Sequence, residues 1–369
     1  MNPVPYLDLS RARRRVEPEL HVRWQKILDG NAFILGPEVK EFEAAFAAFL
    51  GATAAVGVAN GTDALTVALR ALGVGPGDEV IVPAFSFFAT AEAVVLAGGT
   101  PVFADIEPDT YNLDPADAGA RVGARTVGVI GVHLYGRPFD AERLGALCRQ
   151  RGLWLVEDAA QAHGARFGSR RVGTLGDLAA WSFYPTKNLG AFGDAGAVSG
   201  MDGDLMQKVS RVANHGQTER YHHVEIGTNS RLDSLQAAVL NLRLRTLDAD
   251  NAKRRALAAI YHERLAGVGD LRFPLDRPDD EPVFHQMTIA TAQRDELQKF
   301  LAERGVGSSV HYPAPLHRLP AVAGFLPVPP ELPHAERAAT EVLCLPMFAE
   351  LTADEADGAV AAVRAFYGA

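Results

Sequence analysis

Two acidic residues end a short apolar run in the middle of the chain. Leu153-Trp-Leu-Val156 has the composition of a buried strand, and Glu157 and Asp158 follow it directly. Because open α/β sheets bind ligands at the carboxyl ends of their strands, an acid there can face a ligand. Asp158 could pair with a protonated ring nitrogen, and Ala160, two residues on, would leave room for a flat ring. Taken alone, Asp158 is more typical of a helix N-cap or a surface acid.

Further along, Lys187 follows the apolar run 179–183 and enters a loop with glycines at 190, 193 and 196. An isolated lysine is ordinarily a solvated surface residue. A glycine-rich loop, however, lets the backbone approach a ligand closely, and a desolvated amine has a lowered pKa. Those are the requirements of a lysine that forms a Schiff base. Ser182, just before it, could donate its hydroxyl to a phosphate.

The segment Asn60-Gly61-Thr62 opens a helical run rich in Ala and Leu. The free N–H groups and the positive end of such a helix attract an anion such as phosphate, although this pattern is also a common helix start. The pattern is no Walker loop, because no Gly-Lys-Ser/Thr follows. Gly73–Gly77 precedes a strand instead of opening a helix, which excludes a dinucleotide-binding fingerprint.

These segments belong to a repeated alternation of strand-sized apolar runs and helix-sized stretches. Continuous apolar strands between helices are typical of a mainly parallel central sheet flanked by helices. We therefore predict an α/β fold. The expected strands are 80–83, 101–104, 126–133, 153–156 and 179–183, and the expected helices between them are 89–96 and 140–151.

The second half of the chain has a different pattern. Apolar residues at helical spacing over 233–265 predict one long helix or two, and 274–282 is polar and proline-rich. A strand-like stretch (283–290) and helices over 295–304 and 354–366 follow. We predict a large α/β domain over residues 1–250, which binds the cofactor, and a small C-terminal α+β domain over residues 251–369.

The composition limits the possible functions. The chain has 369 residues, 48% of them hydrophobic, and its 45 acidic residues outnumber 36 basic ones, which argues against a nucleic-acid surface. We see no secretory signal and no apolar run long enough to cross a membrane, so we expect a cytoplasmic enzyme. Cys148 and Cys344 fit buried free thiols, and the histidines show no metal-ligand spacing, so we predict no metal.

The order and spacing of several motifs resemble the DegT/DnrJ-type sugar aminotransferases, which are fold-type-I enzymes that use pyridoxal 5′-phosphate (PLP). The resemblance covers nearly the whole chain. It rests on Phe33–Glu43, Asn60–Leu65, Glu79–Thr90, Val132–Gly136, Glu157–Gln161, Ser182–Leu189 and Gly227–Asp233.

The resemblance implies a role for each matching residue. Lys187 would be the catalytic Schiff-base lysine, Asp158 the partner of the pyridine nitrogen, and Gln161 a neighbour of the ring hydroxyl. The remaining cofactor contacts would be the phosphate-binding Gly61, Thr62 and Ser182, the stacking ring of Phe87, which could instead be a core residue, and Asn229 from the neighbouring subunit. A homodimer with composite active sites follows.

The resemblance also implies a ping-pong transamination. L-Glutamate would donate its amino group, leaving pyridoxamine 5′-phosphate as the intermediate form of the cofactor, and a nucleotide-linked keto sugar would accept it. Lys187 would move the proton between donor and cofactor carbons. Related dehydratases carry histidine at this position, so the lysine favours transamination. A PLP-dependent sugar dehydratase and a non-enzymatic PLP-fold regulator are the alternatives.

The segment Ser308–His317 resembles the His-Tyr-Pro-x-Pro-x-His stretch of members that aminate C3 of the sugar. It implies a dTDP-linked 3-keto-6-deoxyhexose as substrate, with a UDP-linked 3-keto sugar or a 4-keto sugar as alternatives. A Tyr–Pro turn with two histidines is also a common structural element. For His163 we expect a structural role, and Arg220 could equally be solvated. The candidate substrate contacts are Tyr184, Arg220, His311, Tyr312 and His317.

Overall fold

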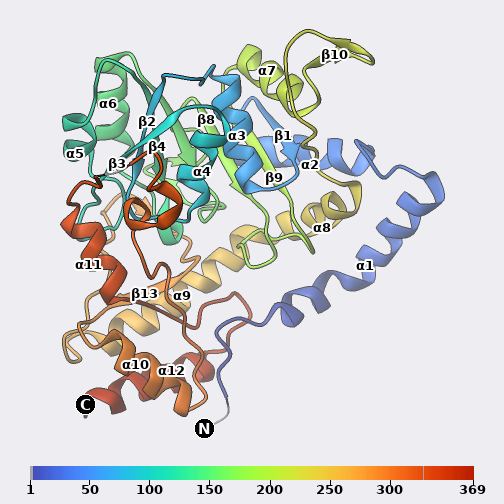
Figure 1. The fold of residues 1–369 in the computed structure, drawn as a ribbon. Coiled ribbons are helices and arrows are strands. Elements are labelled where there is room, and N and C mark those ends of the chain that lie inside the picture. The colour runs from blue at the N-terminus through green and yellow to red at the C-terminus, as the bar shows by residue number, and fades with distance from the viewer. Residues whose placement is uncertain (1–2, 327) are drawn as a thin grey trace.

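The computed structural model describes residues 3–326 and 328–369. Its centre is a seven-stranded sheet in the order β1-β9-β8-β5-β4-β2-β3 (Figure 1). The pairs β8–β5, β5–β4, β4–β2 and β2–β3 are parallel, whereas β9 is antiparallel to both β1 and β8. The strands are β1 (Ala54–Val58), β2 (Glu79–Pro83), β3 (Thr100–Ala104), β4 (Thr126–Val132), β5 (Trp154–Asp158), β8 (Leu178–Ser182) and β9 (Gly196–Gly200).

Helices cover both faces of this sheet. Along each strand, alternate side chains point to opposite faces: Val80 and Val82 pack in the core under α3, α4 and α7, whereas Ile81 packs under α5 and α6. The helices of this part are α2 (Pro37–Leu50), α3 (Gly61–Ala71), α4 (Ala89–Leu96), α5 (Pro115–Ala120), α6 (Ala141–Arg151), α7 (Gly203–Ala213) and α8 (Ser234–Leu244), with the 3-10 turn η1 (Leu134–Gly136).

A separate hydrophobic core lies in the C-terminal part. It joins α9 (Leu247–Leu265), β13 (Met287–Ala290), α10 (Arg294–Glu303), β14 (Val342–Leu345) and α12 (Ala353–Tyr367). Val4 belongs to the same core, and Figure 1 shows both ends of the described chain beside α10 and α12. The N-terminal segment thus packs with the end of the chain. The division near residue 250 remains a prediction.

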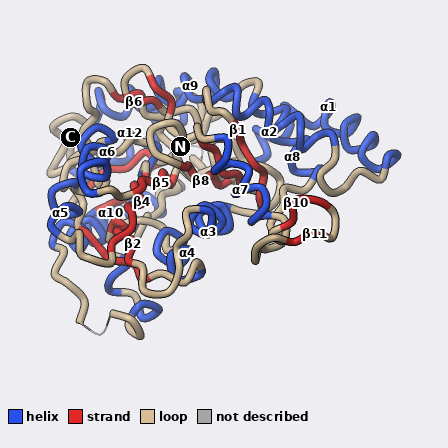
Figure 2. The backbone as a smooth tube through the Cα atoms, turned by 90° about the horizontal axis from the view of Figure 1, so that it is seen from above, coloured by secondary structure: helices blue, strands red, loops and turns tan. Residues whose placement is uncertain are grey.

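The remaining elements are short or peripheral. They are α1 (Leu9–Gly30), β6 (Arg166–Phe167), β7 (Arg170–Arg171), β10 (Gln217–Glu219), β11 (His222–His223), β12 (Asp280–Glu281), η2 (Leu316–Arg318), η3 (Pro320–Val322) and α11 (Pro333–Glu341). The β10–β11 hairpin and α1 extend from the body, as the view from above also shows (Figure 2). None of the described helices is long and apolar enough to cross a membrane.

The predicted α/β class with a mainly parallel sheet is confirmed. The long helical stretch over 233–265 is two helices, α8 and α9, and the strand expected over 283–290 is shorter, Met287–Ala290. The polar stretch 274–282 contains one short strand, β12, that pairs with β6. Strand β1 and the glycine-bearing strand β9 were not predicted.

Candidate active site

The two carboxylates at the end of β5 point to opposite faces of the sheet. Glu157 is fully buried and accepts hydrogen bonds from the backbone N–H groups of Gly173, Leu175 and Gly176 at 2.7–2.8 Å. His133 Nε2 lies 3.0 Å from the same carboxylate. Glu157 therefore holds the loop before β8, and its neighbour Asp158 is left for the other face.

Asp158 faces α4. Its Oδ2 accepts a hydrogen bond from the Thr90 hydroxyl at 2.8 Å, and its Oδ1 accepts one from the Ala160 N–H at 3.3 Å. Thr90 Oγ1 lies in turn 2.9 Å from Ser86 Oγ. Burial raises the pKa of Asp158, while the bond from Thr90 and the charge of Lys187 act in the opposite direction. A buried carboxylate of this kind gains most from a cationic ligand group.

Lys187 lies in the loop that links β8 to β9, and its N–H bonds to the carbonyl of Tyr184 at 2.8 Å. Burial lowers the pKa of its ammonium group to about 8, although the negative charge of Asp158 raises it. An amine with this pKa is partly neutral near pH 8 and can act as a nucleophile.

The residue after the lysine holds this loop in place. Asn188 is buried, and its Nδ2 donates at 3.0 Å to Asn251 Oδ1 on α9 and at 3.0 Å to the carbonyl of Val283. Its Oδ1 lies 3.2 Å from His285 Nδ1. Three contacts to the C-terminal half therefore fix the backbone beside Lys187.

The N-terminus of α3 provides a place for an anion. The Asn60 side chain caps the N–H of Asp63 at 2.8 Å, which leaves the first N–H groups of the helix, at Gly61 and Thr62, without an intrahelical partner. A Cβ on Gly61 would lie 2.6 Å from Ser182 Cβ, so the two backbones approach as only glycine permits. Gly61 and Ser182 are thus side by side, with Thr62 next in the chain, and their binding of a phosphate stays a prediction.

A group of polar and aromatic side chains adjoins Asp158. Gln161 Oε1 accepts from the Tyr135 N–H at 2.6 Å, and its Nε2 donates to the Tyr312 hydroxyl at 3.1 Å. The Phe87 ring, 58% exposed, lies 5.9 Å from the Tyr312 ring between centroids. Phe87 is not a core residue in this chain, and its exposed face is available for a ligand.

The other predicted substrate residues lie in different places. His311 is half-buried, and the charge of Lys187 contributes, after burial, to lowering its pKa. Tyr184 is half-exposed. His317 is buried, with its ring beside Phe103 and its Nε2 3.0 Å from Glu336 Oε1. These contacts join β3, η2 and α11, and a contact between His317 and substrate stays a prediction.

Two predicted residues lie toward the protruding hairpin. Arg220 is exposed and stacks on Tyr221 at 5.0 Å. Asn229 is exposed and pairs with Asn214 in an isolated bridge. The His163 ring lies beside the rings of Trp181 and Phe183, and burial lowers its pKa to about 3, so it is neutral. Its structural role stays a prediction.

Sequence reasoning missed the groups that hold these side chains. Thr90 lies four residues after Ser86 on the helix that begins beside Phe87, and this spacing was the available signal. Asn188 and Tyr135 lie within the motifs Ser182–Leu189 and Val132–Gly136, but their hydrogen-bond partners are distant in the chain, so no local pattern predicted these bonds. Among the described residues, no cluster of three or more His, Cys, Asp or Glu side chains could hold a metal ion.

Together these groups fit a flat heterocycle that carries a phosphate. Asp158 suits a protonated ring nitrogen, Phe87 offers an aromatic face, and Lys187 supplies an amine for a carbonyl carbon. The N-terminus of α3 beside Ser182 suits the phosphate. PLP has all four of these complementary parts.

The chain belongs to the DegT/DnrJ/EryC1/StrS aminotransferase family, whose model matches residues 15–364. It is therefore an aminotransferase that uses PLP. It is 46% identical, over 98% of this chain and 95% of the relative, to "dTDP-3-amino-3,4,6-trideoxy-alpha-D-glucose transaminase" of Streptomyces venezuelae.

Two further matches agree with this. "UDP-2-acetamido-2-deoxy-3-oxo-D-glucuronate aminotransferase" of Pseudomonas aeruginosa is 42% identical over 93% of this chain and 95% of the relative. The crystal structure of S. venezuelae DesV in complex with a ketimine intermediate superposes with a TM-score of 0.97, at 45% identity, over 100% of both chains.

Proposed function

We propose that this enzyme transfers an amino group from L-glutamate to C3 of a nucleotide-linked keto sugar, and that the sugar is a dTDP-linked 3-keto-6-deoxyhexose. The observation that carries the proposal is the position of Tyr312, bonded to Gln161 beside the Asp158 end of the site. The names of the relatives, one dTDP-linked and one UDP-linked, both place the nitrogen at C3.

Each residue has a defined task in this reaction. When bound, PLP supplies an electron sink for the carbon that loses its proton. Asp158 would keep the ring nitrogen protonated, and the N-terminus of α3 would hold the phosphate. Lys187 would bind the cofactor carbonyl carbon and, once free, its amine would carry the proton between the substrate carbon and the cofactor carbon. Burial makes Lys187 a usable base near neutral pH by lowering its pKa to about 8.

The two half-reactions test the proposal separately. Mixing the holoenzyme with L-glutamate should convert the Schiff-base absorbance band to that of pyridoxamine phosphate. The converted enzyme should then react with 3-keto sugars bearing dTDP faster than with those bearing UDP, and faster than with 4-keto sugars. A preference for a 4-keto sugar would refute the regiochemistry, and a dehydrated product would refute transamination.

Lys187→Ala should abolish both the Schiff-base band and turnover. The matched control is Lys40→Ala, which removes an exposed lysine of α2. Full turnover in Lys187→Ala would remove Lys187 from the mechanism.

We further propose a homodimer in which Asn229 of one subunit reaches the phosphate site of the other. Asn229 is exposed in its own chain, and exposed apolar side chains lie nearby on the hairpin segment at Tyr221, Val224 and Ile226, which are 79%, 52% and 91% exposed. Exposed apolar groups gathered in one segment are typical of an interface.

A mixing experiment separates composite sites from independent ones. Lys187→Ala and Asn229→Asp enzymes, each inactive as a homodimer, are unfolded together and refolded. If the sites are composite, a mixed dimer regains one site with both native residues, and turnover returns. If each subunit builds its own site, the mixture stays inactive.

A further inference from the structure

A chain of hydrogen bonds runs from Asn188 to His311. Asn188 Oδ1 lies 3.2 Å from His285 Nδ1, and His285 Nε2 lies 3.3 Å from Gln286 Nε2. Gln286 Oε1 accepts from the Tyr6 hydroxyl. The Tyr6 oxygen lies 3.1 Å from His311 Nε2. The chain thus connects the neighbour of the catalytic lysine with a predicted substrate contact.

Backbone carbonyls fix the direction of this chain at one end, because a carbonyl oxygen can only accept. The carbonyl of Val283 receives a bond from Asn188 Nδ2 at 3.0 Å, and Asn251, the other acceptor of Nδ2, is itself oriented by the carbonyl of His163 at 2.8 Å. Asn188 Oδ1 therefore faces His285 and accepts. His285 must carry a proton on Nδ1.

The donor and acceptor roles of the remaining residues follow one after another from this proton on His285 Nδ1. Burial holds the pKa of His285 well below its ordinary value, so the ring is neutral and its Nε2 accepts from the Gln286 amide nitrogen. Gln286 Oε1 then faces Tyr6, whose single proton it accepts. The Tyr6 oxygen can only accept from His311 Nε2. His311, whose pKa is lowered by burial and by Lys187, is therefore neutral with its proton on Nε2 and a bare Nδ1.

Tyr312, the residue after His311, offers a hydrogen-bond donor instead of an acceptor. Gln161 Oε1 is occupied by the N–H of Tyr135 at 2.6 Å, so its Nε2 donates to the Tyr312 oxygen at 3.1 Å. Tyr312 keeps its own proton for donation, and burial raises its pKa. One acceptor, His311 Nδ1, and one donor, the Tyr312 hydroxyl, therefore belong to consecutive residues.

We infer that Tyr6, Gln286 and His285 are positioning residues that hold His311 in the Nε2–H tautomer, so that its Nδ1 accepts a hydrogen bond from a sugar hydroxyl adjacent to the ketone. The inference rests on the proposed function. It specifies the substrate class as α-hydroxy ketones of a sugar ring: the ketone oxygen accepts from Tyr312 while the neighbouring hydroxyl donates to His311. Sugars deoxygenated at that carbon leave Nδ1 unpaired.

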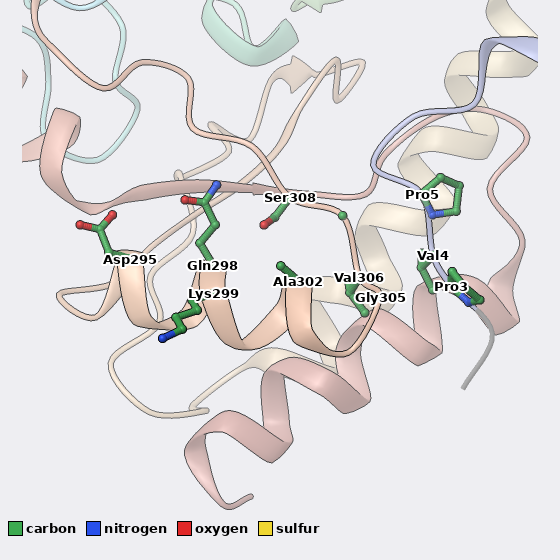
Figure 3. A pocket seen from close by; sticks show the side chains of 11 residues that line it. Pro3, Val4, Pro5, Asp295, Gln298, Lys299, Ala302, Gly305, Val306 and Ser308 are labelled. Atoms are coloured by element: carbon green, nitrogen blue, oxygen red, sulfur yellow. The ribbon is translucent and has the colours of Figure 1, made fainter.

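Backbone hydrogen bonds anchor the N-terminal segment and so place Tyr6 in the series of hydrogen bonds between Asn188 and His311. The N–H of Val4 donates to the carbonyl of Gly305 at 2.8 Å, and the N–H of Gly307 donates to the carbonyl of Val4 at 2.8 Å. Figure 3 shows Val4 and Pro5 beside Gly305 and Val306, where they line an open hollow of about 650 Å³ next to α10. These contacts fix the backbone just before Tyr6, and the Tyr6 backbone itself packs against Gly307.

The first test is Tyr6→Phe, with Tyr367→Phe as the matched control. Tyr367 also loses a hydroxyl that is bonded, to Asp270 at 2.8 Å and to Thr291 at 2.7 Å, but outside this network. The readout is kcat/KM for a 3-keto sugar with the adjacent hydroxyl divided by that for its deoxy analogue. We expect this ratio to fall roughly tenfold in Tyr6→Phe, a change of about 1.4 kcal/mol, and to stay unchanged in Tyr367→Phe.

The glutamate half-reaction distinguishes a failure of the proposed function from a failure of the inference about Tyr6 and His311. If wild-type enzyme reacts with glutamate but with no keto sugar, the proposed function fails. If it aminates keto sugars and Tyr6→Phe leaves the ratio unchanged, or slows the glutamate half-reaction to the same extent, the inference fails.

A second measurement needs no variant of Tyr6. In enzyme labelled with ¹⁵N-histidine, the two ring nitrogens of His311, assigned with His311→Gln, should show a protonated Nε2 and an unprotonated Nδ1. The other tautomer, or an equal mixture, overturns the inference even if Tyr6→Phe does not fold.

Discussion

Removing the hydroxyl that supports Asp158 should impair the chemistry without touching the cofactor directly. The Asp158 carboxylate has two hydrogen bonds within the described chain, from Thr90 at 2.8 Å and from Ala160 at 3.3 Å. Thr90→Val removes the shorter one and preserves the volume. A hydrogen bond to a charged group contributes about 1.5–3 kcal/mol, so the glutamate half-reaction should slow by roughly 10- to 100-fold.

The pH dependence of the glutamate half-reaction should shift in a defined direction in Thr90→Val. Burial already raises the pKa of Asp158, and the Thr90 bond lowers it because it stabilises the charged form. In Thr90→Val the pKa rises further, so the acid limb of the half-reaction must move to higher pH. Thr90→Ser keeps the hydroxyl and is the matched control. If Thr90→Val equals Thr90→Ser in rate and in acid limb, Thr90 does not act through the Asp158 charge.

Three further predictions follow from single contacts. Because burial lowers the pKa of Lys187 to about 8, the rate of PLP capture by the apoenzyme should rise with pH and level off above about 8 in stopped-flow absorbance. Gly61→Ala should weaken PLP binding more than tenfold, because the added Cβ meets Ser182 Cβ at 2.6 Å; Gly203→Ala, with nothing within 4 Å, should not. Glu157→Gln should lower the melting temperature, since one oxygen that now accepts N–H groups becomes a donor; an unchanged melting temperature would contradict its role in holding the 173–176 loop.

The sequence predicted the parts of this fold that depend on local pattern. Continuous apolar runs predicted the parallel strands, and the order of β5, β8 and the lysine loop predicted the site. Strand β9 was missed because Gly196 and Gly200 gave the run the composition of a loop. Only its pairing with β8 in the folded sheet identifies it as a strand, and there Ser199 Oγ accepts a hydrogen bond from Trp181 Nε1 at 2.8 Å.

The candidate site likewise contains residues that local patterns could predict and residues that depend on partners distant in the chain. Asp158, Lys187 and the start of α3 lie at strand or helix ends, and their positions follow from the elements themselves. Tyr6 bonds to a residue 280 positions away, and Asn188 to one 63 positions away. No periodicity or motif contains such a pairing. For His317 the motif predicted a substrate contact; its Nε2 lies 3.0 Å from Glu336 Oε1, and the substrate contact stays a prediction.

The two half-reactions would share the cofactor and its proposed contacts and differ in the groups around the acceptor sugar, and this decides which substitutions should affect which step. The groups proposed to hold the cofactor, Asp158 with Thr90 and Gly61 with Ser182, belong to the central sheet and its helices. The groups proposed to lie around the sugar, His311 with Tyr6, belong to segments that pack with the C-terminal core. Asn188 bonds across this division, to Val283 and to α9, so the lysine that serves both steps is fixed by both parts. Substitution of Asn188 and Thr90→Val should therefore slow both half-reactions, whereas Tyr6→Phe should slow only the second.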